Sequence, residues 1–343
     1  MDTGKLSETA KAMMAGDKGL LAMDESTTTA NKRFAAAGIP QNEETRRAYR
    51  DMIVTTRGMG DCLNGAILVD ETIRQQTRAG IPFAQALERQ GIIPGIKVDA
   101  GAKPMPSHPN EKLTSGLDDL RERLAEYAKM GARFAKWRAV ITIGDGIPSR
   151  GCIEANTLLL ALYAALCQEA GIVPIVEPEV LMDGDHTLDR CMRVTEQTLH
   201  TVFDQLVTQR ILLEGMILKP NMIVPGKDAK KQNTDEEIAE ATVHTLLRTV
   251  PAAVPGVAFL SGGQTGEQAC ARLSAMNSGF RNRLPWALTY SFARAIQQPA
   301  MDIWHGEDAN VPAAQKALIH RAQCARAARR GEYSPAMEKM ERE

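Results

Sequence analysis

The stretch Ile172-Val-Pro-Ile-Val-Glu-Pro-Glu179 decides the fold class. Five apolar residues are followed by two carboxylates, as expected of a buried parallel strand whose end carries charged groups. Seven similar runs, rich in Val, Ile and Leu, lie before and after it, and longer segments of helical period separate them. This alternation predicts an α/β protein with parallel strands joined by helices.

The apolar runs number eight in all. They are Gly19–Met23, Gly65–Val69, Ile92–Val98, Ala132–Trp137, Ile172–Val176, Gly215–Leu218, Gly256–Leu260 and Pro285–Tyr290. Successive runs start 27 to 46 residues apart, close to the length of one βα unit with its loops. Eight units predict a closed, eight-stranded parallel (β/α) TIM barrel. Because no Gly/Ser-rich linker divides the chain, we expect one domain over residues 1–343, with a basic C-terminal helix at about 311–330 and a flexible tail at 331–343.

Composition excludes several classes of protein. The 343 residues include 41 basic and 42 acidic side chains, and neither sign forms a long block that would suit nucleic acid or a membrane surface. Residues 1–16 carry charges and lack the apolar core of a secretory signal. The longest apolar run, Leu158–Cys167, is short for a membrane span. These features favour a cytoplasmic protein with neither nucleic-acid nor membrane partners.

Cysteine and histidine spacing gives little support for a metal site. The six cysteines are scattered, which favours reduced thiols in packing roles over a disulfide framework or a zinc site. No His-Glu-x-x-His motif occurs. Asp183-Gly-Asp-His186 could bind a metal, but a turn is the favoured reading. We therefore expect no metal and no other cofactor.

Two intervening helices are marked by their first residues. Thr234 with Glu237, and Thr265 with Gln268, have the spacing of a capping box, in which each side chain bonds the other residue's backbone amide. Both pairs precede helical patterns, so we expect helices to begin there.

Polar groups follow nearly every apolar run. In a βα barrel the active site lies at the C-terminal ends of the strands. The runs end in Asp24-Glu25-Ser26, Asp70-Glu71, Lys97-Val98-Asp99, Lys136-Trp137-Arg138, Glu177-Pro178-Glu179, Lys219-Pro220-Asn221, Ser261-Gly262-Gly263 and Ser291 with Arg294. Charges are costly to bury unless paired, so their convergence on one barrel mouth predicts catalysis or ligand binding.

Three lysines at strand ends suggest the kind of chemistry. Any one of Lys97, Lys136 and Lys219 could be a surface residue or an ion-pair partner, but three would face one cavity. Burial and neighbouring positive charge would then lower the pKa of the amine. A neutral amine can attack a ketone, and the resulting iminium draws electrons from an adjacent carbon–carbon bond. The residues themselves do not rank the three lysines.

Carboxylates are needed for the accompanying proton transfers. One must act during formation and dehydration of the carbinolamine, and one must take a proton from a substrate hydroxyl. Asp24, Glu177 and Glu179 are candidates, although each could equally be an ion-pair partner of these lysines.

A phosphate site is expected after the seventh and eighth strands. Leu260-Ser-Gly-Gly-Gln-Thr265 offers glycines that let backbone amides approach an anion, next to a predicted helix start. Arg294, in Ser291-Phe-Ala-Arg294, can grip phosphate with two N–H groups. A Gly-Gly pair is only a turn in most proteins, but phosphate binding at these two loops recurs among such barrels.

Together these segments resemble class I fructose-bisphosphate aldolases of the animal and plant type, from about Ser7 to Pro335. The shared motifs are Leu21-Ala-Met-Asp-Glu-Ser26, Gly95-Ile-Lys-Val-Asp99, Phe134-Ala-Lys-Trp-Arg138, Ile175-Val-Glu-Pro-Glu179, Leu218-Lys-Pro-Asn-Met222 and Leu260-Ser-Gly-Gly-Gln264. The resemblance implies a homotetramer that reversibly cleaves fructose 1,6-bisphosphate, a sugar bisphosphate, into the triose phosphates dihydroxyacetone phosphate and glyceraldehyde 3-phosphate. This is a step of glycolysis and gluconeogenesis.

The resemblance also implies roles for individual residues. Lys219 would form the Schiff base, Glu177 would be the acid and base of the carbinolamine steps, and Asp24 would assist proton removal during cleavage. Lys136 and Glu179 would orient this cluster. The phosphate nearest the ketone would be held by Ser261, Gly262, Gly263, Ser291 and Arg294, and the other end of the substrate by Lys97, Arg138, Ser26, Lys32 and Arg33.

Two departures from the family pattern carry expectations of their own. No tyrosine follows Tyr333, whereas animal members use a final tyrosine in proton exchange, so we expect slower protonation of the enamine or a substitute proton donor. Ala293 stands where glycine is common, and its methyl disfavours positive φ, so phosphate affinity would differ. Two alternatives remain open, namely a Schiff-base aldolase for a singly phosphorylated sugar and a barrel without catalytic activity.

Overall fold

Eight parallel strands form the centre of the fold. The structure, a computed structural model, describes residues 2–339. The strands close into a barrel in the order β1-β10-β9-β8-β7-β6-β3-β2, which confirms the predicted TIM barrel. Their bounds are β1 (Gly19–Ala22), β2 (Leu63–Leu68), β3 (Ile93–Lys97), β6 (Phe134–Ile141), β7 (Val173–Val180), β8 (Ile217–Leu218), β9 (Gly256–Phe259) and β10 (Ala287–Phe292).

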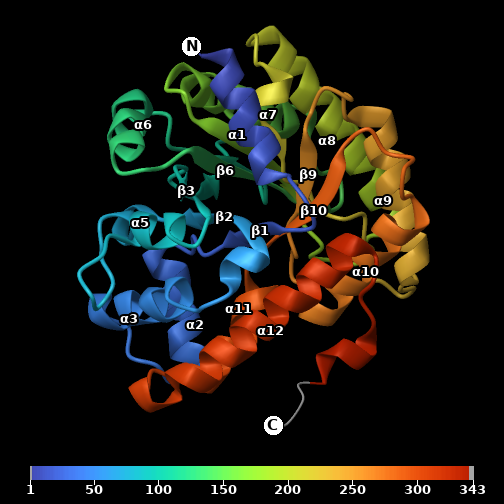
Figure 1. The fold of residues 1–343 in the computed structure, drawn as a ribbon. Helices are drawn as coiled ribbons and strands as arrows, with labels where there is room; N and C mark the ends of the chain where they lie inside the picture. The colour runs from blue at the N-terminus through green and yellow to red at the C-terminus, as the bar shows by residue number, and fades with distance from the viewer. Residues whose placement is uncertain (1, 340–343) are drawn as a thin grey trace.

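Helices surround the barrel (Figure 1). The α-helices are α1 (Thr3–Met13), α2 (Thr27–Ala36), α3 (Glu43–Val54), α4 (Asp70–Ile73), α5 (Phe83–Glu88), α6 (Leu120–Lys129), α7 (Arg150–Glu169), α8 (Leu188–Thr208), α9 (Asp235–Thr249), α10 (Gly266–Gly279), α11 (Arg294–Trp304) and α12 (Val311–Arg330). Short 3-10 turns are η1 (Met59–Asp61), η2 (Leu213–Gly215), η3 (Asp308–Asn310) and η4 (Pro335–Glu338). A small hairpin, β4 (Ala102–Pro104) with β5 (Lys112–Thr114), lies outside the barrel in a segment whose pattern is that of a loop.

One end of the barrel is closed by α1. Its buried residues Leu6, Ala10 and Met13 pack with Leu20 and Phe134 in an apolar cluster inside the barrel. Figure 1 shows α1 across the top of the barrel, with α11 and α12 below. The opposite end, where the strands finish, is therefore the end that can open to solvent.

Two strands run further than their apolar residues indicate. β6 and β7 continue to Ile141 and Val180, so the polar residues expected after these strands lie inside them. The parallel register pairs Arg138 with Glu177. Buried parallel strands are recognised by apolar side chains, and these charged residues interrupt that pattern because they line the mouth of the barrel.

The predicted capping boxes are confirmed. Thr234 and Glu237 bond each other's backbone amides at the start of α9, and Thr265 and Gln268 do so at the start of α10. All six cysteines are free and buried. By length and composition α7 could cross a membrane, but 56% of its apolar window is buried, as in a core helix of a globular protein.

The chain after α12 folds back onto the helices. Gly331 ends α12 with a positive φ of 73°, and Tyr333 and Met337 then pack against the main core. Two side chains of the segment expected to be flexible thus contact the core, and its flexibility stays a prediction. The remainder of the expected flexible tail, residues 340–343, lies outside the described residues.

Candidate active site

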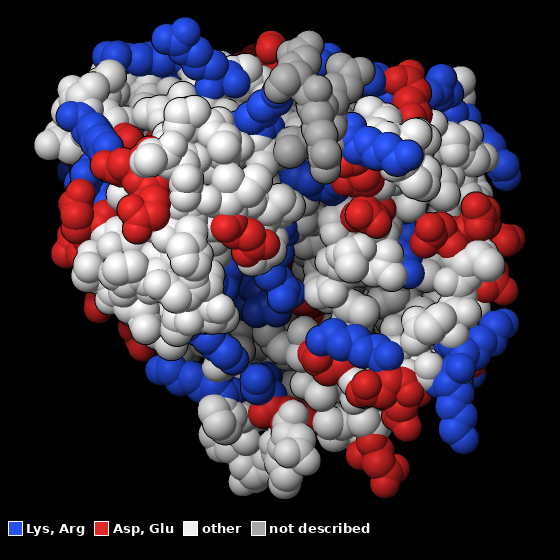
Figure 2. All heavy atoms as spheres, turned by 90° about the horizontal axis from the view of Figure 1, so that it is seen from below, with Lys and Arg blue, Asp and Glu red and all other residues white. Residues whose placement is uncertain are grey.

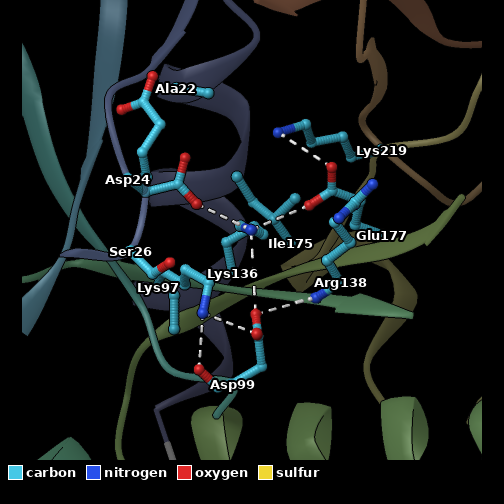
Figure 3. A network of polar contacts seen from close by, with 12 residues as sticks. Ala22, Asp24, Ser26, Lys97, Asp99, Lys136, Arg138, Ile175, Glu177 and Lys219 are labelled. Atoms are coloured by element: carbon cyan, nitrogen blue, oxygen red, sulfur yellow. Dashed lines mark hydrogen bonds and ion pairs between the residues drawn. The ribbon is translucent and has the colours of Figure 1, made fainter. Parts of the chain in front are cut away.

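The charged residues predicted at the strand ends meet at the open end of the barrel. Figure 2 views the molecule from below Figure 1, the side opposite α1, and shows a hollow with Lys and Arg side chains deep inside it. In Figure 3, Asp24, Lys136, Glu177 and Lys219 point toward one another from separate strands or strand ends. Each is at most 8% exposed, so the cluster is screened little by solvent.

Lys136, in β6, is the centre of this cluster. Its Nζ lies 2.8 Å from Asp24 Oδ2, 3.2 Å from Glu177 Oε2 and 3.9 Å from Asp99 Oδ2. Side chains two apart on a strand share a face, so β6 and β7 direct Lys136 and Glu177 into the same interior. One ammonium group thereby lies within 4 Å of three converging carboxylates.

The pKa values of the cluster follow from this pairing. Burial disfavours the charged form of Lys136, but Asp24, Glu177 and Asp99 outweigh it, so the pKa of Lys136 is raised. Burial likewise acts to raise the pKa of Asp24, but Lys136 and Lys219 lower it to about 2. The prediction that burial lowers the pKa of these lysines is therefore wrong for Lys136, because carboxylates surround it.

Lys219 has a different environment. It directly follows the two-residue strand β8, and its N–H bonds the carbonyl of Val176 at 2.8 Å. Its Nζ lies 3.3 Å from Glu177 Oε1, its one ion-pair partner among residues 2–339. The three lysines are therefore not equivalent, since Lys136 is bound by several carboxylates and Lys219 by one.

Asp99 is a member of the cluster that the sequence analysis did not select. Its side chain is 3% exposed, and Oδ1 lies 2.7 Å from the Nζ of Lys97. Its other oxygen accepts a hydrogen bond from the backbone N–H of Arg138 at 3.3 Å. The spacing of Lys97 and Asp99, two residues apart at the end of β3, is a signal that could have found it.

Arg138 and Glu179 form an ion pair beside this network. Glu179 is 5% exposed, whereas the side chain of Arg138 is 41% exposed and reaches the mouth of the barrel. The guanidinium can therefore meet an anion that enters from solvent while it stays paired with Glu179.

The predicted phosphate loop lies next to Arg294. Gly262 and Gly263 have φ values of 55° and 92°, a left-handed pair that turns the loop after β9. A Cβ on Gly262 would lie 3.8 Å from Oε1 of Glu179, and one on Gly263 would lie 3.7 Å from Nη2 of Arg294. The loop therefore joins the carboxylate cluster to an exposed arginine at the start of α11.

Two serines border the same loop. Ser261 is 6% exposed, and Ser291, in β10, is 1% exposed. The Ser291 hydroxyl has no hydrogen-bond partner among the described residues. A buried hydroxyl without a partner is costly, so an anion bound here would satisfy it.

Ala293 precedes Arg294 and has a negative φ, as expected of an alanine. Its backbone has φ −106° and ψ −91°, so this position does not use the positive φ that an alanine methyl disfavours. Its side chain packs against the apolar cluster inside the barrel. The effect of this alanine on phosphate affinity stays a prediction.

The remaining predicted residues lie on α2 or cap it. Ser26 caps this helix, accepting a hydrogen bond from the N–H of Thr29 at 3.3 Å. Lys32 is exposed, and Arg33 is paired with Glu25. The structure thus brings Lys97, Arg138 and the catalytic candidates into one network, while Arg33 belongs to a separate ion pair.

The arrangement is suited to covalent catalysis by an amine. It combines a buried lysine, an adjacent carboxylate, a charged lysine that holds further carboxylates, and cationic groups for anions. Among the described residues one group of three potential metal ligands lies close together, and it is on α12 and η4 rather than in this cluster.

Comparisons with known proteins agree with this chemistry. The sequence model of the family described as fructose-bisphosphate aldolase class-I matches residues 5–343. A probable fructose-bisphosphate aldolase class 1 from Xanthomonas campestris pv. campestris is 54% identical over 323 residues, covering 94% of this chain and 96% of that protein. A fructose-bisphosphate aldolase from Dictyostelium discoideum is 50% identical, covering 96% of this chain and 93% of that protein. A solved fructose-bisphosphate aldolase from Plasmodium falciparum superposes with a TM-score of 0.95 at 44% identity, covering 97% of this chain and 96% of that one.

Proposed function

This chain belongs to the class I fructose-bisphosphate aldolase family, a family of lyases, and from that premise we propose that Lys219 forms its Schiff base. The substrate is fructose 1,6-bisphosphate, and the products are dihydroxyacetone phosphate and glyceraldehyde 3-phosphate. The contrast between the two buried lysines carries this proposal. Lys136 is held as an ammonium by three carboxylates, whereas Lys219 has one ion-pair partner in residues 2–339.

Nucleophilic attack requires an amine that can lose its proton. Glu177, 3.3 Å from the Nζ of Lys219, is placed to accept this proton. The free amine then attacks the keto carbon, and a proton passes from its nitrogen to the new alkoxide to give the carbinolamine. The protonated carboxyl returns its proton to the carbinolamine hydroxyl, which leaves as water. The iminium that remains withdraws electrons when the bond between the third and fourth carbons of the sugar breaks.

Asp24 assists the removal of a proton from the hydroxyl on the fourth carbon. Its pKa of about 2 keeps it ionised, so it can accept a hydrogen bond from that hydroxyl at any working pH. A carboxylate with so low a pKa is a weak base by itself. Glu177 contacts Lys136, as Asp24 does, and can accept the proton of the hydroxyl. Lys136 and Glu179 orient the cluster.

Two cationic regions support a doubly phosphorylated substrate. Ser261, Gly262, Gly263, Ser291 and Arg294 would bind the phosphate nearest the ketone. Lys97, Arg138, Ser26, Lys32 and Arg33 would surround the other end. A singly phosphorylated sugar would leave the second set without an anion, so we expect lower kcat/KM on fructose 1-phosphate than on the bisphosphate.

Borohydride trapping tests the nucleophile. The protein is incubated with dihydroxyacetone phosphate and a chelator, reduced, digested and analysed by peptide mass spectrometry. A stable adduct on Lys219 is the expected result. An adduct on Lys136 or Lys97 would reassign the nucleophile, and loss of activity to the chelator without any adduct would overturn the covalent mechanism.

We further propose that the chain forms one domain, works in the cytoplasm and assembles as a homotetramer. The six free cysteines fit a reducing compartment. The most exposed large apolar side chains, Leu158, Val207 and Leu247, lie on the neighbouring helices α7, α8 and α9, where a subunit could cover them. Light scattering coupled to size-exclusion chromatography would test the assembly, and a monomeric mass would refute it.

A further inference from the structure

Three potential metal ligands meet where the chain folds back onto α12. His320 and Cys324 lie one turn apart on this helix, and Glu338 ends η4. Their ligand atoms all lie within 4.8 Å of one another. We propose that these residues form a binding site for a thiophilic divalent cation, with Zn²⁺ the best match, which clamps the segment after Gly331 to α12.

Cys324 and His320 need to move little for both to bind one Zn²⁺ ion. The Sγ of Cys324 lies 3.8 Å from the Nε2 of His320. Zn–S and Zn–N bonds of about 2.3 and 2.0 Å at a tetrahedral angle separate sulfur and nitrogen by about 3.5 Å. Residues four apart share one face of a helix, so the backbone already aims both ligands at one point.

The ligand types also select the cation. Thiolate and imidazole favour Zn²⁺ over Mg²⁺ or Ca²⁺, which prefer oxygen ligands. Glu338 supplies an oxygen as the third ligand, and a water molecule can complete four-coordination. Binding replaces the thiol proton of Cys324 with the metal, and the proton goes to solvent, so no redox partner is needed.

Contacts with Tyr333 and Arg321 orient the Glu338 carboxylate. The Tyr333 hydroxyl donates a hydrogen bond to Oε1 of Glu338 at 2.7 Å, and Arg321 pairs with the other oxygen. A carboxylate has about four acceptor positions, so each oxygen keeps one for a metal. Such second contacts are typical of protein metal sites, where they fix the direction of the ligands.

Arg321 also limits the affinity. Its positive charge opposes a cation, but its remaining donors are held by the carbonyl of Ala295 and by Cys270. The thiolate and the carboxylate supply two negative charges against Arg321 and the metal. We therefore expect weaker binding than at a structural site of four cysteines.

The position of Glu338 links this clamp to the barrel mouth. Glu338 and Arg321 line a cavity of about 480 Å³ together with Gly263 and Arg294. A metal at Glu338 would stiffen one wall of that cavity. The binding site itself rests only on α12 and η4, so it stands or falls independently of the Schiff base on Lys219.

Cobalt spectroscopy tests the site directly. The full chain, stripped of metal, is titrated with Co²⁺ and followed by absorption. We expect one thiolate-to-cobalt charge-transfer band per chain, d–d bands of a tetrahedral site, and loss of both when Zn²⁺ is added. Absence of a saturable charge-transfer band would overturn the proposal.

Variants identify the ligands. Cys324→Ser should abolish the band, whereas Cys62→Ser, which changes an equally buried cysteine, should leave it intact. His320→Gln, at a half-buried position, should weaken Co²⁺ binding at least about tenfold, with exposed His200→Gln as its control. If Cys324→Ser does not fold, the His320 pair decides the result. A band unaffected by Cys324→Ser, or equal affinities in the two histidine variants, would refute the site.

Hydrogen exchange tests the clamp. Zn²⁺ should slow amide exchange in residues 332–339 of the unmodified chain and have no such effect in His320→Gln. Unchanged exchange in a protein that has bound Zn²⁺ would show that the metal does not hold this segment, and would overturn that part of the proposal.

Discussion

Oε1 of Glu177 lies 3.3 Å from the Nζ of Lys219, while its other oxygen lies 3.2 Å from the Nζ of Lys136. One carboxylate therefore contacts the two buried lysines that the sequence could not rank. Because Asp24 and Asp99 also surround Lys136, removal of charge from Glu177 should affect Lys219 more strongly. This relationship makes Glu177 the most informative residue to change.

Glu177→Gln keeps the size of the side chain but removes its ability to accept a proton. We expect kcat to fall by about 10²- to 10⁴-fold, the usual contribution of a positioned acid or base. KM should change little, since the residues proposed to bind the phosphates are unchanged. Steady-state kinetics and the rate of borohydride trapping would both be measured, with exposed Glu154→Gln as the control. A variant that forms the adduct at the normal rate would exclude Glu177 from carbinolamine chemistry.

Asp24→Asn should reveal the electrostatic contribution of the buried cluster to stability. Burial acts to raise the pKa of Asp24, but Lys136 and Lys219 lower it from 3.8 to about 2. A lowered pKa stabilises the folded state above pH 3.8, and this contribution is lost as the pH falls through about 2. The shift corresponds to about 2 kcal/mol.

The measurement is urea unfolding of both proteins between pH 7 and pH 2. The variant should be less stable by about 2 kcal/mol at pH 7, and the difference should shrink below pH 4. Asp204→Asn, on the exposed face of α8, should show no such trend. A difference that stays constant across this range would mean that the Asp24 charge does not stabilise the fold.

The alternation of apolar runs and helical segments was sufficient to predict the barrel. Each of the eight runs contains or overlaps a strand, because buried parallel strands need continuous apolar residues. Strand ends were harder to predict. Arg138 and Glu177 were placed after strands but lie within them, since charged residues can occupy a strand where the barrel interior provides partners.

The contacts among the site residues could not be predicted from the sequence. The sequence contains Asp99 two residues after Lys97, but only the structure shows that Asp99 also lies 3.9 Å from Lys136. Likewise, burial and neighbouring charge oppose each other at a lysine, and their balance depends on distances. The rise in the pKa of Lys136 could therefore not be read from residue types alone.

Gly263→Ala and Ala293→Gly form a matched pair of changes in the phosphate region. Gly263 has φ 92°, so alanine would strain the loop by about 1–2 kcal/mol. We expect KM for fructose 1,6-bisphosphate to rise about tenfold, the equivalent of about 1.4 kcal/mol. Ala293 has φ −106°, so Ala293→Gly should leave KM unchanged and reduce stability by about 0.5–1 kcal/mol.

Steady-state kinetics and thermal unfolding of both variants check this pair. An increase in KM for Ala293→Gly as large as that for Gly263→Ala would show that backbone conformation does not control phosphate binding here. Unchanged KM in Gly263→Ala would mean that the loop does not contact the phosphate.

Tyr333→Phe tests whether this tyrosine supplies the proton to the enamine. Burial and the hydrogen bond to Glu338 raise the pKa of Tyr333, and its hydroxyl is 2.7 Å from Oε1 of that carboxylate. A phenol held by a structural partner in η4 is poorly placed to protonate a carbon in the barrel. We expect the exchange of the dihydroxyacetone phosphate proton with deuterated water, followed by nuclear magnetic resonance, to be the same in Tyr333→Phe as in the unmodified chain. Slower exchange with unchanged cleavage would instead make Tyr333 a proton donor, and it would require the segment after Gly331 to leave its position on α12 during turnover.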